Sequence, residues 1–133
     1  MHVTPEAFLA IASEVINSNG DLAAAVNMRT YIAHFRLDST GTSDLWNKLQ
    51  DYCVNDEVTL KNGDKLKLTD FGESHLLWTL FHLNVYPTND VGSAFCNVTR
   101  HTYRKYTMGM IMFLNLLRKH LVCYIYVMIT CYF

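Results

Sequence analysis

Acidic residues are missing from the end of this chain: no Asp or Glu follows Asp90, and residues 1–90 contain all 12 of them. Lys and Arg are divided more evenly, with six before residue 91 and five after it. The two parts therefore carry charges of −6 and +5 within a net charge of −1. Such asymmetry is typical of a chain whose basic part meets a polyanion or an anionic surface. Five cations are also few enough for an ordinary solvated surface, so charge alone does not choose between these interpretations.

Several functional patterns are also missing. The four cysteines (Cys53, Cys96, Cys123 and Cys131) have no paired short spacings, which argues against a zinc knuckle or a disulfide framework. No charged-then-apolar leader opens the chain, so we expect an intracellular, reduced protein. His75 and His82 are seven residues apart and would need a third ligand to hold a metal. With no Gly-rich phosphate loop and no Ser/His or Cys/His constellation, we predict no catalytic residue, metal, cofactor or small-molecule substrate.

The apolar run from residue 121 to the C-terminus is only 13 residues long. A helix that spans a bilayer needs about 20 apolar residues. Extending the run backwards would bring in Arg118, Lys119 and His120, which are costly at membrane depth. We therefore expect this tail to be buried or to pair with a second copy in a homodimer, and we do not expect a membrane span.

Helix signals dominate the first 53 residues. Thr4-Pro5-Glu6 provides a capping hydroxyl, a proline at the first helical position and an acid near the positive end of the helix dipole. We expect this helix to end at Asn19-Gly20 and a second, capped by Asp21, to reach about Phe35. Residues 38–44 form a cluster of turn residues, after which a third helix should place Leu45, Trp46, Leu49 and Tyr52 on one side.

The segment VTLKNGDKLKL, residues 58–68, alternates apolar and polar residues on both sides of Asn62-Gly63. Asn-Gly favours a tight hairpin turn because both residues tolerate positive φ. An isolated two-stranded hairpin is marginal, so this one must either pack against the helices or be a loose loop.

The next segment predicts two helices. Asp70 and Glu73 have the spacing of a capping box, and Leu76, Leu77, Leu80 and Phe81 would face inward from the helix that it opens. That helix should end near Tyr86-Pro87. Thr88 or Asp90 can cap a short helix over residues 91–95, and residues 96–98 would form a turn.

Residues 98–117 give the strongest pattern. Tyr103, Tyr106, Met110, Phe113 and Leu117 make one apolar helical stripe, and Met108 and Met112 are also expected in the core. Thr99 suits the N-cap, while Arg100, His101, Arg104 and Lys105 share another face. A short helix, a turn and a cationic helix together describe a helix-turn-helix. We predict Thr99, Arg100, His101, Arg104 and Lys105 as DNA-binding residues, with a solvated helix face as the alternative.

The segment HLLWTLFHLNVYPTNDVGSAFCNVTRHTYRKY, residues 75–106, resembles the region before the catalytic domain of PIF/Harbinger-type transposases. Leu76-Leu77-Trp78, Val85-Tyr86, Val98, Thr102 and Arg104-Lys105 stand at matching places, and residues 34–49 are similar to the family's FR…FGTS…LW segment. The resemblance extends over about residues 29–113. It implies a DNA-binding helix-turn-helix.

This sequence departs from the family pattern at two places. Asn97 replaces the usual glycine before the recognition helix, which is tolerable because Asn also accepts positive φ. The metal-dependent nuclease domain that would follow is missing, and the three acids that its chemistry requires cannot be found after Asp90. The resemblance therefore implies a shortened, non-catalytic protein.

The sequence thus predicts an all-α, small multi-helix domain with a helix-turn-helix, and it leaves open one short β-hairpin near residues 57–68. Its parts are an N-terminal helical region (1–69), the helix-turn-helix region (70–117) and an apolar tail (118–133). The expected function is non-catalytic, transposase-derived binding of double-stranded DNA in the major groove, in the nucleus. The alternatives are a self-association or membrane-surface module that uses the tail, and a truncated relic without function.

Overall fold

The computed structural model describes residues 2–17 and 27–132, with side chains described as far as Val122. These described residues form six α-helices and one small hairpin, which agrees with the predicted all-α domain. In chain order the elements are α1 (Pro5–Asn17), α2 (Met28–Phe35), α3 (Ser39–Cys53), β1 (Glu57–Thr59), β2 (Lys65–Lys67), the 3-10 turn η1 (Leu68–Asp70), α4 (Glu73–Val85), α5 (Asn89–Cys96) and α6 (Arg100–Tyr132).

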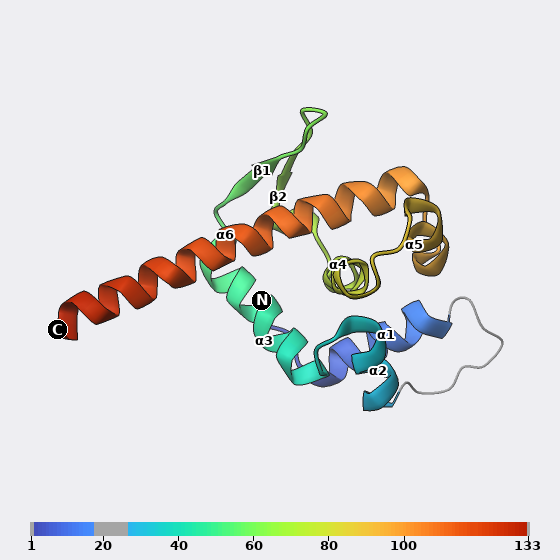
Figure 1. Ribbon diagram of the computed structural model, residues 1–133, viewed down its shortest axis with the longest axis horizontal. Coiled ribbons are helices and arrows are strands. Elements are labelled where there is room, and N and C mark those ends of the chain that lie inside the picture. The colour runs from blue at the N-terminus through green and yellow to red at the C-terminus, as the bar shows by residue number, and fades with distance from the viewer. Residues whose placement is uncertain (1, 18–26, 133) are drawn as a thin grey trace.

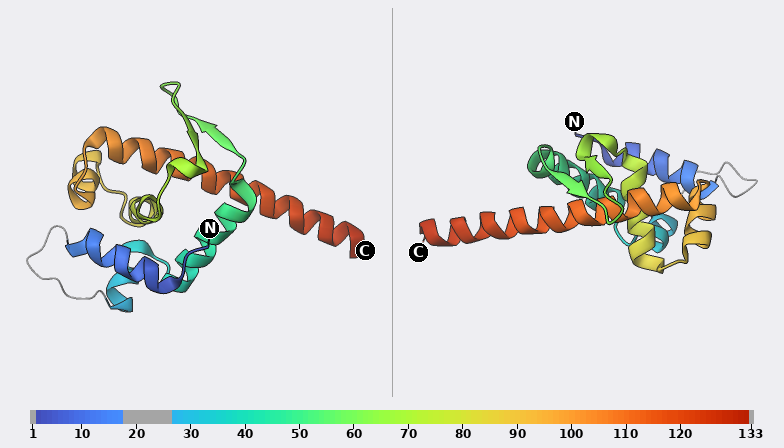
Figure 2. Two further views of the ribbon diagram at one scale, coloured as in Figure 1. Left: turned by 180° about the vertical axis from the view of Figure 1, so that it is seen from behind. Right: turned by 90° about the horizontal axis from the view of Figure 1, so that it is seen from above.

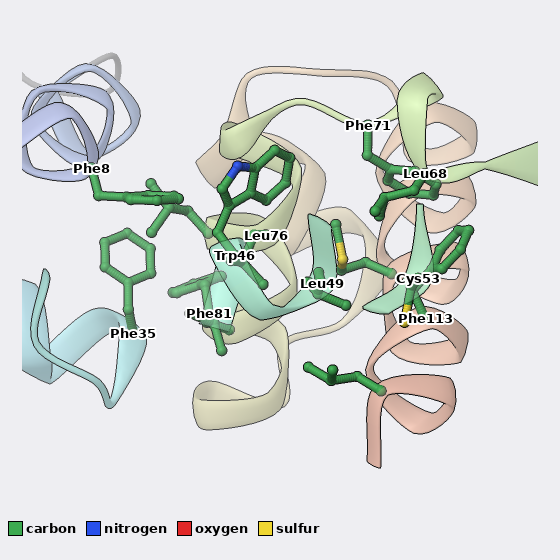
Figure 3. Close-up of a cluster of buried hydrophobic side chains, with 14 of the residues drawn as sticks. Phe8, Phe35, Trp46, Leu49, Cys53, Leu68, Phe71, Leu76, Phe81 and Phe113 are labelled. Carbon is green, nitrogen blue, oxygen red and sulfur yellow. The ribbon is translucent and has the colours of Figure 1, made fainter. Parts of the chain in front are cut away.

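The long helix α6 crosses the whole molecule, with the hairpin on one side of it and α1, α2 and α3 on the other (Figure 1). Four members of its predicted apolar stripe are buried: Tyr103, Met110, Phe113 and Leu117. The main core forms where this stripe meets the other helices (Figure 3). Its largest fully buried members are Phe8, Tyr31, Phe35, Leu49, Leu68, Leu76, Leu77, Met110 and Phe113.

The predicted hairpin forms and packs on α6. Val58 pairs with Leu66 across the antiparallel strands, and both side chains are buried. Gly63 takes a φ of 94° in the turn, as the Asn-Gly signal requires. Gly109 of α6 lets the hairpin approach, because a Cβ there would lie 2.9 Å from Leu66 Cδ1 and 2.8 Å from Phe71 Cζ. The hairpin is therefore a fixed part of the domain.

The start of the second helix was predicted incorrectly. Asn27 has an extended backbone (φ −77°, ψ 164°), and its side chain accepts from the Thr30 amide at 2.9 Å, so α2 begins at Met28 and the predicted helix up to Phe35 is not continuous through residue 27. Asn is as favourable an N-cap as Asp, and the sequence prediction did not consider Asn27 as a helix start. The predicted stop at residues 19–20 and the predicted cap at residue 21 lie outside the described residues.

The turn cluster predicted at residues 38–44 is wrong, because these residues form the first turns of α3. Asp38 is the N-cap, and its side chain accepts from the Gly41 amide at 2.6 Å. Ser and Thr disfavour helix interiors because their hydroxyls compete for backbone partners. Here Thr42 Oγ1 donates to the Asp38 carbonyl and accepts from the buried Tyr31 hydroxyl, both at 2.9 Å. These hydrogen bonds allow polar residues to be buried within the helix.

The capping box predicted from Asp70 and Glu73 is also wrong. Asp70 accepts from the Lys67 amide at 2.8 Å and closes η1 instead. The N-cap of α4 is Gly72, whose amide donates to His75 Nδ1 at 2.8 Å. The helix ends as predicted, since Tyr86, before Pro87, takes a left-handed backbone (φ 52°, ψ 50°).

The backbone of α6 continues without a break through residue 118, where the sequence places the start of a separate tail. Its C-terminal half extends beyond every other element (Figure 2). Among the helices in the described part of the chain, none is both long and apolar enough to cross a membrane.

Candidate nucleic-acid interface

A turn joins α5 and α6 as predicted, but α5 is longer than the predicted 91–95 and the connection is at 97–99, one residue later than predicted. Thr88 caps α5 by accepting from the Val91 amide at 3.2 Å. Asn97 ends it in the left-handed region (φ 56°, ψ 46°), and the Val98 amide donates to the Ser93 carbonyl at 3.0 Å. Thr99 then caps α6, accepting from the Thr102 amide at 3.2 Å. Three residues, 97–99, therefore separate the two helices and leave little freedom in how α6 begins.

Close packing fixes α5 against the first turns of α6. The Tyr103 ring is fully buried and lies over Gly92, where a Cβ atom would approach to 2.5 Å of Cε1 and nearer still to Cζ and Oη. The Tyr103 hydroxyl is hydrogen-bonded to His82 Nδ1 of α4 at 2.8 Å. Trp78 and Cys96 complete this second buried cluster. One tyrosine thus joins α4, α5 and α6.

A second aromatic contact joins α4 to α6. The His75 ring stacks on Tyr106 with centroids 4.0 Å apart and planes 2° apart. Burial lowers the pKa of His75, which keeps the ring neutral, and Nδ1 accepts from the Gly72 amide. The proton is accordingly assigned to Nε2. The sequence shows both residues but does not show that they meet, since the pairing is a tertiary contact.

The predicted cations point away from this packing. Arg100, His101 and Arg104 are exposed, Lys105 is half-buried, and the Thr99 cap is exposed. Arg100 Nε lies 3.1 Å from Asp90 Oδ1 in an ion pair whose side chains are 66% and 74% exposed. Exposed pairs of this kind contribute little, about 0–1 kcal/mol, so Arg100 can exchange Asp90 for another anion. Lys105 Nζ lies 5.6 Å from the Tyr106 ring centroid.

A groove of about 580 Å³ lies between the hairpin and this cationic face. His101, Arg104 and Lys105 line it from α6, and Lys61 lines it from the turn side of the hairpin. Its floor includes Met108 and Met112. Met112 is 37% exposed, which corrects the prediction that it belongs to the core. Lys61 was not among the predicted site residues, although it precedes the Asn62-Gly63 turn signal, which indicates that its side chain lies near the tip of a hairpin.

The hairpin adds further cations. Its apolar side chains face α6, so Lys65 and Lys67, which alternate with Leu66, are exposed on the other face. Lys61 is exposed beside them. The hairpin also carries Glu57, which pairs with Lys67 across the strands, and Asp64, so its own charge is nearly balanced. Of its three lysines, Lys61 lines the groove beside the cationic face of α6, where it can add a phosphate contact.

No protein-family model matches the chain, and neither a curated protein nor a solved structure shows a significant match to it.

Proposed function

We propose that this chain is a non-catalytic, transposase-derived protein that binds double-stranded DNA with the N-terminal turns of α6 in the major groove. The observation that carries the proposal is the outward cationic face of a helix whose start is fixed by α4 and α5. The resemblance of residues 75–106 to PIF/Harbinger-type transposases supports the same function, and the nucleus is the corresponding location.

The chemistry of the face fits duplex DNA. An α-helix fits the major groove, and its N-terminal end carries partial positive charge. No acidic residue occurs in the first turn of α6. Arg100 and Arg104 can bond guanine edges in a bidentate manner or contact phosphate, and Lys105 can contact phosphate. His101 and the Thr99 hydroxyl can supply additional polar contacts to the backbone.

The hairpin extends this surface. With α6 in the major groove, Lys61, which lines the groove from the hairpin, is available for a flanking phosphate. Affinity should then come mainly from neutralised phosphates and released counterions, and it should fall steeply as salt increases.

Charge reversal of the helix face tests this function. In the full chain, Arg100, Arg104 and Lys105 are changed together to Glu, and binding to a duplex oligonucleotide is measured by fluorescence anisotropy at low salt. Arg100 and Arg104 are exposed and Lys105 is half-buried, so none of the three is a core residue. The fold should therefore persist, and circular dichroism checks that it does. The proposal predicts loss of binding. Unchanged affinity would reject α6 as the element that contacts DNA.

A matched control distinguishes the effect of this site from the effect of net charge. Arg29, Lys48 and Arg118 are exposed and lie outside the proposed surface, and their reversal to Glu changes the net charge equally. This control should retain most of its DNA affinity. An equal loss of affinity in both variants would mean that DNA binding depends only on the net charge of the protein. Helical circular dichroism without DNA affinity in the parent protein would favour a relic without function.

The projecting C-terminal half of α6 favours a second candidate, self-association or attachment to an anionic membrane surface. Arg118 and Lys119 are exposed at the start of this segment. Deleting residues 121–133 distinguishes the two functions: DNA binding should survive, whereas dimerisation or binding to anionic vesicles should disappear.

A further inference from the structure

Three side chains with metal-binding atoms meet where α3 ends beside α6. They are Cys53 at the end of α3, Asp56 three residues later and His120 of α6. The Cys Sγ, an Asp carboxylate oxygen and a His ring nitrogen all lie within 4.8 Å of one another. The closest pair is Asp56 Oδ2 and His120 Nε2, at 2.9 Å. Two of the residues come from one turn, and the third is 64 residues away from Asp56.

The fold itself brings these groups together. The Asp56 amide donates to the Cys53 carbonyl at 3.0 Å, which closes the turn and places both side chains on one side. Leu117, three residues before His120, is buried in the core and fixes the rotation of α6. The His120 ring also lies against Tyr52, with centroids 6.3 Å apart. The ligand atoms are therefore positioned by packing before any ion binds.

We propose that Cys53, Asp56 and His120 form a binding site for a divalent transition-metal ion, with zinc as the preferred occupant. A thiolate, a carboxylate and an imidazole are the three side-chain ligand types of Zn²⁺ in proteins, and a soft sulfur ligand disfavours Ca²⁺ and Mg²⁺. Thiolate and carboxylate together balance the charge of the ion. The site is independent of the proposed DNA interface.

The geometry requires only a small adjustment. With Zn–S near 2.3 Å and Zn–N or Zn–O near 2.0 Å, ligand atoms of a tetrahedral site are roughly 3.3–3.8 Å apart. The widest separation, up to 4.8 Å, must contract by about 1 Å, and the Asp56–His120 pair must lengthen from 2.9 Å by about 0.4 Å. The His120 and Asp56 side chains are 41% and 34% exposed, so an ion can enter from solvent and a water molecule can occupy the fourth position. Burial, with the nearby Asp56 carboxylate, raises the pKa of Cys53 to about 11, so the ion must displace the thiol proton.

Such an ion would join the α3–hairpin junction to the middle of α6. Because the ligands come from segments far apart in the chain, an ion bound only to the folded state adds stability by mass action. Zn²⁺ should therefore raise the melting temperature of the protein.

Titration of the full chain with Co²⁺ tests the site directly. We expect one equivalent to produce a thiolate-to-cobalt charge-transfer band and the intense d–d bands of four-coordinate cobalt, and Zn²⁺ should remove both. The signal should disappear in Cys53→Ala and in His120→Gln. His120 is partly exposed, so His120→Gln should fold even if Cys53→Ala does not, and circular dichroism checks this.

Substitutions of the other cysteines show which thiol supplies the sulfur ligand of the cobalt ion. Cys96→Ala removes another buried thiol and should leave the cobalt spectrum unchanged. A variant with Ser at both Cys123 and Cys131 should also retain it. The proposal is overturned if no charge-transfer band appears, if His120→Gln leaves the band intact, or if the band depends on Cys123 and Cys131 and not on Cys53.

Discussion

Replacing Gly92 by Ala tests how closely α5 is packed against α6. Gly92 is buried within α5, and a Cβ there would come within 2.5 Å of Tyr103 Cε1. Carbon atoms in contact normally lie about 3.5–4.0 Å apart, so the overlap exceeds roughly 1 Å. The Tyr103 ring cannot easily turn away, because it is fully buried and its hydroxyl is bonded to His82. Relief therefore requires α5 to move.

The expected magnitude follows from two opposing effects. Ala favours a helix over Gly by about 1 kcal/mol. Overpacking of a tight interior costs typically about 1–3 kcal/mol, and the severity of this overlap places it at the upper end. We expect Gly92→Ala to lower the free energy of unfolding by roughly 1–2 kcal/mol, which for a domain of this size lowers the melting temperature by about 3–10 °C.

Urea unfolding followed by circular dichroism provides the assay, and Ala94→Gly is the matched control. Ala94 is exposed on the same helix, so its change to Gly should cost about 1 kcal/mol by propensity alone. Both substitutions should therefore destabilise the protein: Ala94→Gly because Gly is a poor helix former, and Gly92→Ala because the added methyl group overlaps the Tyr103 ring. In a Tyr103→Leu background the ring is gone, and Gly92→Ala should cost at least about 1 kcal/mol less. Stabilisation by Gly92→Ala in the parent chain would refute the packing.

Three further predictions concern buried groups. Tyr31→Phe leaves the buried Thr42 hydroxyl without its donor and should lower the free energy of unfolding by about 1 kcal/mol in urea melts, whereas no change would show that the bond contributes nothing. Burial lowers the pKa values of His75 and His82 below the ordinary 6.5, so just below that pH the unfolded chain binds more protons than the folded chain. The free energy of unfolding should therefore decrease as the pH is lowered from about 7.5 to 5. Changing both residues to Gln should make it depend less on pH. Burial raises the pKa of Cys96 to about 12, so iodoacetamide at about pH 8 should alkylate it far more slowly in native than in urea-unfolded protein, as peptide mass spectrometry would measure; equal rates would place it at the surface.

Local signals predicted the parts of the fold that depend on neighbouring residues. Asn62-Gly63, Tyr86-Pro87 and Asn97 mark changes of chain direction through their backbone preferences, and the structure has a turn or helix end at each. The Thr99 cap and the stripe along α6 follow from helical spacing. These features need no knowledge of what packs against them.

The features that sequence did not predict depend on partners distant in the chain. Thr42 is helical and buried because Tyr31 from another helix supplies its hydrogen bond. Asp70 closes a 3-10 turn because the strand before it is fixed on α6. Among the candidate binding residues, Lys61 joins the groove only through the packing of the hairpin. The spacing of residues in the sequence also does not predict that Cys53 lies near His120, because α3 and α6 come together only in the folded chain.

The salt dependence of DNA binding shows whether the N-terminal turns of α6 contact phosphates. The slope of log affinity against log salt counts the phosphates that the protein neutralises, at about 0.9 for each. DNA contact by α6 predicts a steep negative slope for the parent chain. When Arg104 and Lys105 are both changed to Gln, the slope should become smaller in magnitude by about one for each of the two that contacts a phosphate. Equal slopes for the two proteins would contradict the claim that the N-terminal turns of α6 contact DNA.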